Sequence, residues 1–388
     1  MHMKYIIWLA ALLPVTAVAG IFPPAAEQPG SQAVPAGDAG IAGWATGYQD
    51  YQIGLNVDAV FQTPAKALGV PGNSDGSEQG VIFDIVSLGT GGSITVSFSP
   101  PIANGAGFDF AVFENSFDGT FLELAKVEVS SDGINFVAFP AFSTVPAAVS
   151  SFGNLDPTDI EQVAGKYRGG FGTPFDLQQL NGSAGLDLSS IRYVRLVDIV
   201  GDGTATNDLS PQSLANWLGV TVGELPQVLV DVANSAPAVL YDPYQTFGSA
   251  GFDLDAVGVL EQGTVPVAIE VDPWNAAPID PDATATFPII VYSSSLVTGD
   301  LDNFDATGID DSELRLGYFD AAPVSGPFIF DWDSDGLADA GYQFQTQDTG
   351  IACEDTAVPL QGRTVDGLVF ASTGAIATLD CPNSGCHP

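Results

Sequence analysis

The sequence predicts an all-β protein in which a larger β-sandwich is followed by a second, smaller β-sandwich. Three observations favour this fold class. The 388 residues include 44 glycines and 27 prolines, which is typical of many turns between short strands. Hydrophobic residues make up 46% of the chain, enough to fill more than one core. Apolar residues also recur with the two-residue period of a strand in several segments.

The clearest strands form a hairpin around residue 131. Residues 109–113 are almost continuously apolar, as in a strand that is buried on both faces. Residues 122–129 alternate between apolar and charged positions, which indicates a half-buried strand. Asp132 and Gly133 suit the tight turn that follows, because glycine adopts positive φ without strain. The next strand is expected to begin at Ile134.

The other expected elements follow from the same pattern. One region, residues 209–233, is a helical candidate, because Ser210 can cap a helix that starts with Pro211. The change of pattern at residues 261–265 predicts a boundary between a domain at 47–261 and a smaller domain at 265–388. Further strands are expected at 80–86, 93–98, 191–200, 251–260, 265–271, 287–293, 313–318 and 366–370.

The N-terminus has the features of a signal peptide at residues 1–19. Lys4 precedes an apolar run at 5–18, and Ala17-Val18-Ala19 is a small-x-small cleavage site. The run is too short to span a membrane, and no second span is expected. Residues 20–46 are rich in proline, alanine and glycine and predict a loose leader. We therefore expect a secreted or cell-surface protein.

The charge of the chain is strongly negative. The chain has nine lysine and arginine residues and 47 aspartate and glutamate residues, which gives a net charge of -38. Such a chain repels nucleic acid and anionic membrane surfaces, so neither is an expected partner. It attracts cations. Solubility in an extracellular medium is an equally good explanation, so calcium sites must be argued from local motifs.

The most specific motif is an acidic loop at residues 331–339. Asp331, Asp333 and Asp335 occupy positions 1, 3 and 5, Gly336 occupies position 6, and Asp339 occupies position 9. This spacing is the calcium-loop pattern, in which alternate carboxylates face the ion and glycine makes the sharp turn. The alternative is a solvated acidic turn.

Two further ligands would complete that loop. The carbonyl of Leu337 would be the backbone ligand. Tyr342 stands where an EF-hand has glutamate, so the loop is more similar to those of dockerins and thrombospondin type 3 repeats, which recruit a later ligand. Asp348 is a candidate for that ligand. We expect the bound calcium to have a structural role.

A second, dispersed acidic set predicts another cation site where strands of the first domain end. The set consists of Asp198, Asp202, Asp208, Asp253 and Asp255, together with Glu114 and Asn115. Ordinary loop carboxylates are the alternative, and a glycosidase acid and base is another.

Histidine is nearly absent, since only His2 and His387 occur. A Ser-His-Asp or Cys-His catalytic group is therefore not expected in the mature body, and neither is a histidine-rich zinc site. We expect a protein that is not an enzyme.

Three cysteines, Cys353, Cys381 and Cys386, allow at most one internal disulfide. Cys381, Cys386 and His387 could form a stretched haem-attachment motif, with His387 as the axial ligand. The alternative is a Cys353–Cys381 disulfide that closes the last domain.

Two segments resemble known families. The hairpin VEVSSDGINFVAF and the later strand IRYVRLVDI resemble the discoidin, or coagulation-factor type C, pattern of the galactose-binding-like jelly roll. Residues 50–260, with GFDFAVFEN, GKYRGGFGTPFDL and GFDLDAVGVL, are also similar to a group of exported bacterial cell-surface proteins. The resemblance implies a jelly-roll fold and export, but no particular ligand.

The C-terminal residues 265–385 are similar to a module found on secreted bacterial proteins. The similarity covers PVAIEV, the acidic loop, QTQDTGI and the cysteines. A cysteine pair recurs in that module at the positions of Cys353 and Cys381, which favours the disulfide over haem.

Together these observations predict an exported, calcium-stabilised, non-catalytic cell-surface protein that recognises a glycan or another surface component. Loops of the first sandwich would bind this partner, and the candidate residues are Glu114, Asn115, Trp44, Tyr48 and Tyr167. One alternative is a structural subunit that self-associates into a surface layer or filament. The other is an exported haem protein that uses Cys381, Cys386 and His387.

Overall fold

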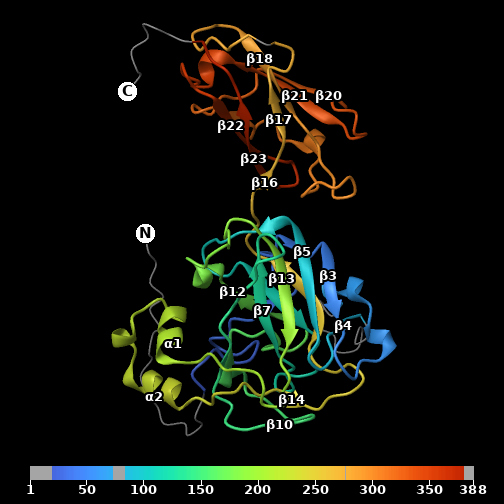
Figure 1. Cartoon of the computed structure of the whole chain (residues 1–388), viewed down its shortest axis with the longest axis vertical. Coiled ribbons are helices and arrows are strands. Elements are labelled where there is room, and N and C mark those ends of the chain that lie inside the picture. The colour runs from blue at the N-terminus through green and yellow to red at the C-terminus, as the bar shows by residue number, and fades with distance from the viewer. Residues whose placement is uncertain (1–19, 73–83, 276, 380–388) are drawn as a thin grey trace.

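The computed structural model describes residues 20–72, 84–275 and 277–379. These residues form mostly antiparallel sheets with two short α-helices, which confirms the all-β prediction (Figure 1). Among the described residues, no helix combines the length and the apolar character needed to cross a membrane. The predicted signal peptide lies outside the described residues.

Two large sheets are built from residues 34–259, and their order follows from the pairing of the strands. The first has the order β1 (Val34–Pro35), β12 (Phe171–Phe175), β6 (Phe110–Glu114), β15 (Asp253–Val259) and β2 (Gly43–Trp44), with β4 (Val86–Ser87) also on β15. The second has the order β3 (Gly47–Gln52), β5 (Ser93–Ile102), β13 (Ile191–Asp198), β7 (Ala125–Ser130) and β8 (Val137–Ala138).

The two sheets share one hydrophobic core. Phe110 and Val112 of β6 belong to the same buried cluster as Val127 of β7 and Val194 and Leu196 of β13. All five residues of β6 are buried, whereas β7 alternates between buried and half-buried positions, as their sequence patterns predict. The arrangement is that of two sheets packed face to face.

The hairpin between β7 and β8 has a longer turn than expected. The carboxylate of Asp132 accepts hydrogen bonds from the backbone N–H groups of Ile134 (2.9 Å) and Asn135 (2.8 Å). These bonds extend the turn, so Ile134 is 81% exposed and the second strand begins at Val137.

The expected loose leader is packed instead. β1 pairs with β12 and β2 pairs with β15, so residues from 20–46 contribute to the first sheet. Phe22 is buried and its ring contacts those of Phe142 and Trp217. The segment therefore packs although it is rich in proline and glycine. Its short strands pair with the first sheet, and apolar side chains such as Phe22 are buried.

The predicted helical region contains two helices, α1 (Pro211–Trp217) and α2 (Gln227–Ser235). The hydroxyl of Ser210 caps α1 by accepting a hydrogen bond from the Ser213 N–H. Gly219 has φ +65°, which ends the first helix, because this left-handed conformation is favourable for glycine.

The residues after 264 form two four-stranded sheets. One has the order β16 (Val265–Pro266), β23 (Val369–Ala375), β22 (Ala357–Arg363) and β19 (Arg315–Leu316). The other has the order β17 (Ile269–Val271), β18 (Thr286–Val291), β21 (Asp339–Gln345) and β20 (Ser325–Phe330). Their buried cluster draws only on residues 265–370, and Figure 1 shows these strands gathered at one end of the long axis.

Smaller elements complete the description. Two short pairs are β9 (Phe142–Ser143) with β11 (Ile160–Glu161), and β10 (Val149–Ser150) with β14 (Pro243–Tyr244). The single-turn 3-10 helices are η1 (Ala59–Phe61), η2 (Pro64–Ala67), η3 (Pro157–Asp159), η4 (Leu177–Leu180), η5 (Val222–Glu224), η6 (Ala306–Gly308) and η7 (Thr346–Asp348).

Candidate metal centres and a neighbouring cleft

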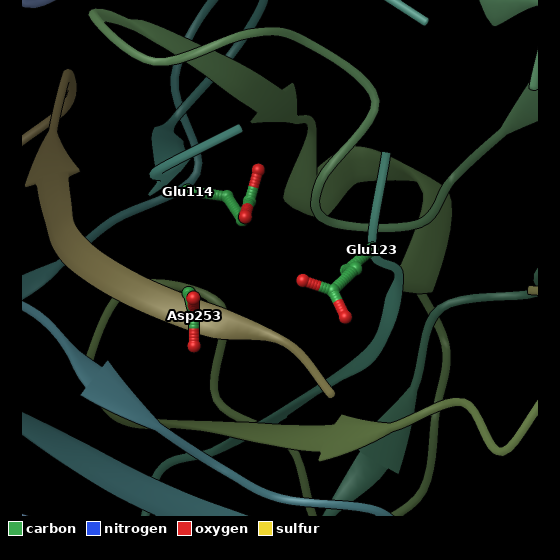
Figure 2. Close-up of side chains that lie close together, drawn as sticks. All are labelled: Glu114, Glu123 and Asp253. Carbon is green, nitrogen blue, oxygen red and sulfur yellow. The ribbon is translucent and has the colours of Figure 1, made fainter. Parts of the chain in front are cut away.

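Three carboxylates meet inside the part of the protein formed by residues 34–259. Glu114 ends β6, Glu123 lies two residues before β7, and Asp253 begins β15. One oxygen of each lies within 4.8 Å of the others (Figure 2). The three residues are 2%, 5% and 6% exposed, respectively. We refer to them as the buried triad.

Strand pairing brings two members of the triad together. β15 and β6 are antiparallel neighbours, and Leu254 pairs with Glu114, which places Asp253 beside the end of β6. Asp198 fixes the chain just before Asp253, because its carboxylate accepts hydrogen bonds from the N–H groups of Gly91 (2.8 Å) and Phe252 (2.9 Å).

The third member is held by its own surroundings. The N–H of Leu124 donates to the buried carboxylate of Asp242 at 2.9 Å, which fixes the chain next to Glu123. Gly165 lies so close that a Cβ there would be 1.9 Å from the Glu123 carbonyl oxygen. Only glycine permits this approach. The φ of +85° at Gly165 also favours glycine, because other residues rarely adopt it.

Two oxygens of the triad are buried without a hydrogen-bond partner. They are Oε2 of Glu114 and Oε1 of Glu123. Asp253 accepts a hydrogen bond from the hydroxyl of Ser87. Buried polar atoms in proteins are nearly always paired, so each of these two oxygens calls for an explanation.

The surroundings of the triad disfavour negative charge. Burial raises the pKa of Glu114 and Glu123 well above the usual range, and the nearby Asp253 adds to both shifts. Burial also raises the pKa of Asp253 to about 7 and that of Asp198 to about 6. The pKa of Asp242 is raised well above its usual range by burial and then by Asp198. The group therefore needs protons or a cation.

A second acidic group lies on the hairpin between β20 and β21. Oxygens of Asp331, Asp333 and Asp335 lie within 4.8 Å of one another. The turn tightens at Gly336, which has φ +94° and donates its N–H to Asp331 at 3.2 Å. Oδ1 of Asp331 is buried and has no hydrogen-bond partner. We call residues 331–339 the acidic loop.

Two further residues predicted as ligands, Asp339 and Asp348, are not in the group formed by Asp331, Asp333 and Asp335. The oxygens of Asp339 accept hydrogen bonds from the N–H groups of Ser293 and Trp332, both at 2.9 Å, so this carboxylate holds the backbone at the end of the loop. Asp348 is in η7, which follows the opposite end of β21. The N–H of Leu337 donates to Asp335 at 2.8 Å.

The dispersed acidic set is only partly brought together. Glu114 and Asp253 meet in the triad, and Asn115, which follows Glu114 in the chain, is half-buried. Asp255 is buried and accepts a hydrogen bond from the Gly72 N–H at 2.8 Å.

Two other members of that set lie at the surface. Asp202 is exposed and accepts hydrogen bonds from Thr204. Asp208 pairs with Lys126 at 3.8 Å. Both carboxylates therefore make contacts at the surface and are not part of the triad.

The three aromatic residues predicted to bind a ligand have different surroundings in the structure. Tyr167 is only 2% exposed, and Trp44 packs on Phe113 with ring centroids 5.4 Å apart. Tyr48 is 44% exposed, but it lies on β3 of the other sheet.

Sequence reasoning missed Glu123 and Asp242. Glu123 stands between Leu122 and Leu124, both fully buried. In an alternating strand such a charge is expected to face solvent. The strand begins later, at Ala125, so the alternation does not apply to residue 123. No local signal distinguishes Asp242 from a turn residue.

A cleft of about 910 Å³ borders the acidic loop. Gly336, Leu337 and Ala338 of the loop form one part of its wall. The other lining residues include the polar Ser294, Ser295, Asn303, Asp305, Thr307 and Asp366. Thr307 donates its N–H and hydroxyl to Asp305 at 2.9 and 2.6 Å, which fixes that carboxylate at the cleft.

The cysteine predictions concern residues at the end of the chain. Cys381, Cys386 and His387 lie outside the described residues. The Cys353–Cys381 disulfide and the haem site therefore stay predictions.

No protein-family model, curated protein sequence or solved structure matches this chain.

Proposed function

We propose that this protein is an exported, calcium-stabilised, non-catalytic surface protein that binds a hydroxyl-rich ligand, such as a glycan, in the cleft beside the acidic loop. The observation that carries this proposal is the position of the cleft, whose wall includes three residues of the loop. A calcium ion held by Asp331, Asp333 and Asp335 would keep that wall in one conformation. A site that is ordered before its ligand arrives loses less entropy on binding.

The chemistry of the cleft suits a polyhydroxylated ligand. Serine and threonine hydroxyls, an amide and carboxylates line it, and these groups can both donate to and accept from sugar hydroxyls. Asn303 is oriented because its amide oxygen accepts a hydrogen bond from the Leu296 N–H at 2.9 Å. Leu337 and Leu368 add apolar area next to the polar groups. Pockets that combine apolar surface with a few fixed polar groups are typical binding sites.

Other features support export and the domain plan. The signal-peptide pattern at residues 1–19 indicates export. The core of residues 265–370 is separate from that of residues 45–259, which supports the two-domain plan. The facing antiparallel sheets of the first part are compatible with the jelly-roll fold that we propose for it. The sequence offers no histidine base between residues 3 and 386, which supports a non-catalytic role.

The test is binding of the full mature chain to a glycan array, in calcium and in chelator. The informative variant is Thr307→Trp, which places a large ring in the cleft. Thr204→Trp is the matched control, because Thr204 makes the same two hydrogen bonds to Asp202, at 3.0 and 2.6 Å, but does not line the cleft. We expect calcium-dependent binding that Thr307→Trp abolishes and Thr204→Trp preserves. Equal binding by both variants, or no glycan bound by the wild type, would reject the proposal.

One observation favours assembly as a second candidate function. β20 is the last strand of its sheet, and all six of its residues are exposed. Phe328, Ile329 and Phe330 are 53%, 48% and 63% exposed. An exposed apolar edge strand readily pairs with a strand of another chain.

A further inference from the structure

We propose that the buried triad of Glu114, Glu123 and Asp253 is a binding site for a calcium ion. This site lies in the part formed by residues 34–259, is separate from the acidic loop, and goes beyond the proposed function.

The spacing of the three carboxylates fits one ion. Calcium binds oxygen ligands at about 2.4 Å, so two oxygens on the same ion lie no more than about 4.8 Å apart. The three oxygens of the triad lie within 4.8 Å of one another. Figure 2 shows the carboxylates of Glu114, Glu123 and Asp253 arranged around a common space.

The free oxygens are the second line of support. Glu114 Oε2 and Glu123 Oε1 are buried and lack partners, on side chains that are at least 95% removed from solvent. A buried carboxylate oxygen without a donor is strongly unfavourable, and a bound cation would satisfy both at once.

The excess of negative charge around the triad also favours a bound cation. The charged neighbours that affect Glu114 and Glu123 most are other carboxylates, with Asp253 first in each case. Five basic residues form ion pairs elsewhere in the described part of the chain, namely Lys126, Lys166, Arg168, Arg192 and Arg195. A divalent cation would offset most of the triad's negative charge.

The ligand chemistry selects calcium among common cations. The site offers only oxygen atoms, whereas zinc prefers sulfur and nitrogen ligands. Magnesium demands octahedral geometry and dehydrates reluctantly, which disfavours it in a buried site. Calcium accepts irregular sets of carboxylates, and each of the three can contribute one or two oxygens.

An ion here would join the two large sheets. Glu114 and Asp253 belong to the first sheet, and Glu123 lies two residues before β7 of the second. Asp198 and Asp242 act as positioning residues, because their carboxylates hold backbone N–H groups next to Asp253 and Glu123. The ion therefore has a structural role, and its removal should loosen the contact between the sheets.

The experiment counts calcium ions on the full mature chain. Protein is stripped with chelator, dialysed and titrated with calcium alone by calorimetry, and bound metal is checked by elemental analysis. The wild type is compared with Glu123→Gln and with Asp331→Asn/Asp333→Asn, which disables only the acidic loop. We expect two ions on the wild type and one on the loop variant, which keeps a calcium-dependent rise in melting temperature. Glu123→Gln should bind calcium at the triad at least about tenfold more weakly than the wild type, because calcium affinity depends on the number of charged ligands.

The outcomes separate this proposal from the proposed function. A loop variant that binds no calcium would overturn the triad site, even if Glu123→Gln failed to fold. Two ions on Glu123→Gln at unchanged affinity would also overturn it. One ion on both the wild type and the loop variant would support the triad, and would instead count against calcium in the acidic loop.

Discussion

At the residue scale, Lys166 is buried in a chain with few basic residues. Its ammonium group contacts the carboxylate of Glu161, and both side chains are nearly inaccessible. The ring centroids of Phe22 and Tyr167 lie 5.9 and 5.6 Å, respectively, from the Lys166 side-chain nitrogen. Burial lowers the pKa of Lys166, and Glu161 opposes that shift. The lysine therefore depends on its partner to remain charged.

We predict that Glu161→Ala lowers the free energy of unfolding by about 3 to 5 kcal/mol, because it leaves a buried ammonium without a counter-charge. Urea denaturation of the stripped protein measures this change. Glu128→Ala is the control, since Glu128 and Arg195 form a half-exposed pair at 3.1 Å that is worth about 1 kcal/mol or less. Equal losses in the two variants would contradict the prediction.

Asp109 makes stability depend on pH. Burial raises its pKa to about 6 in the folded protein, although hydrogen bonds from Gly105 and Leu177 oppose the shift. The unfolded value is near 3.8, so the folded state binds the proton more tightly. The stabilisation is complete below the unfolded pKa and is lost as the pH rises towards 6.

We therefore expect the melting temperature of Asp109→Asn to change less between pH 4 and pH 6 than that of the wild type. The comparison uses metal-free protein and scanning fluorimetry. Asp118→Asn is a control of opposite sign, because hydrogen bonds from Phe121 and Thr120 lower the pKa of Asp118. If Asp109→Asn and wild type had parallel pH profiles, this explanation would fail.

At the scale of elements, β20 is an edge strand of its sheet, and all six of its residues are exposed. One side of β20 pairs with β21, and no described strand of the sheet pairs with its other side. The strand carries no charged residue, although charges commonly block pairing at such edges. The acidic loop that follows it is the nearest negative charge along the chain.

We predict that Ile329→Lys weakens self-association at least about tenfold, which corresponds to about 1.4 kcal/mol. Sedimentation at increasing protein concentration in calcium measures the association. Ile134→Lys is the matched control, since Ile134 is 81% exposed but lies in a hairpin turn. A wild type that stays monomeric throughout would remove the support for the assembly function.

At the scale of the whole molecule, an ion pair between Arg192 and Asp302 connects the two parts of the chain. Arg192 of β13 donates two hydrogen bonds of 2.7 Å to the carboxylate of Asp302. The hydroxyl of Ser99 donates to the same carboxylate at 3.0 Å. The side chains of Arg192 and Asp302 are 12% and 2% exposed. This bidentate contact is well shielded from water, so it should couple the two parts energetically.

We predict that Asp302→Ala destabilises the protein by about 3 kcal/mol, because it leaves Arg192 without its partner. Calorimetry should show the unfolding transitions of the two parts moving apart. Leu301→Ala is the control, since Leu301 is 71% exposed and contributes only its carbonyl to Arg192. Identical thermograms for wild type and Asp302→Ala would show that this contact does not couple the parts.

The sequence was sufficient for the features that depend on short-range physics. Period-two patterns located β5, β13 and β15, since one or both faces of each are buried. Ser210 and Pro211 marked the start of α1 because capping is local. The spacing of Asp331, Asp333 and Asp335 placed three carboxylates on one turn.

Only the tertiary structure decided which distant residues meet. Residues 20–46 pack because β12 and β15 offer edges to β1 and β2, which no local pattern reveals. Glu123 joins Glu114 and Asp253 because the pairing of β6 with β15 and the close approach of Gly165 place them together. Long-range pairing, close glycine contacts and burial are properties of the folded chain. The chemistry of the triad was therefore present in the sequence, but its location was not.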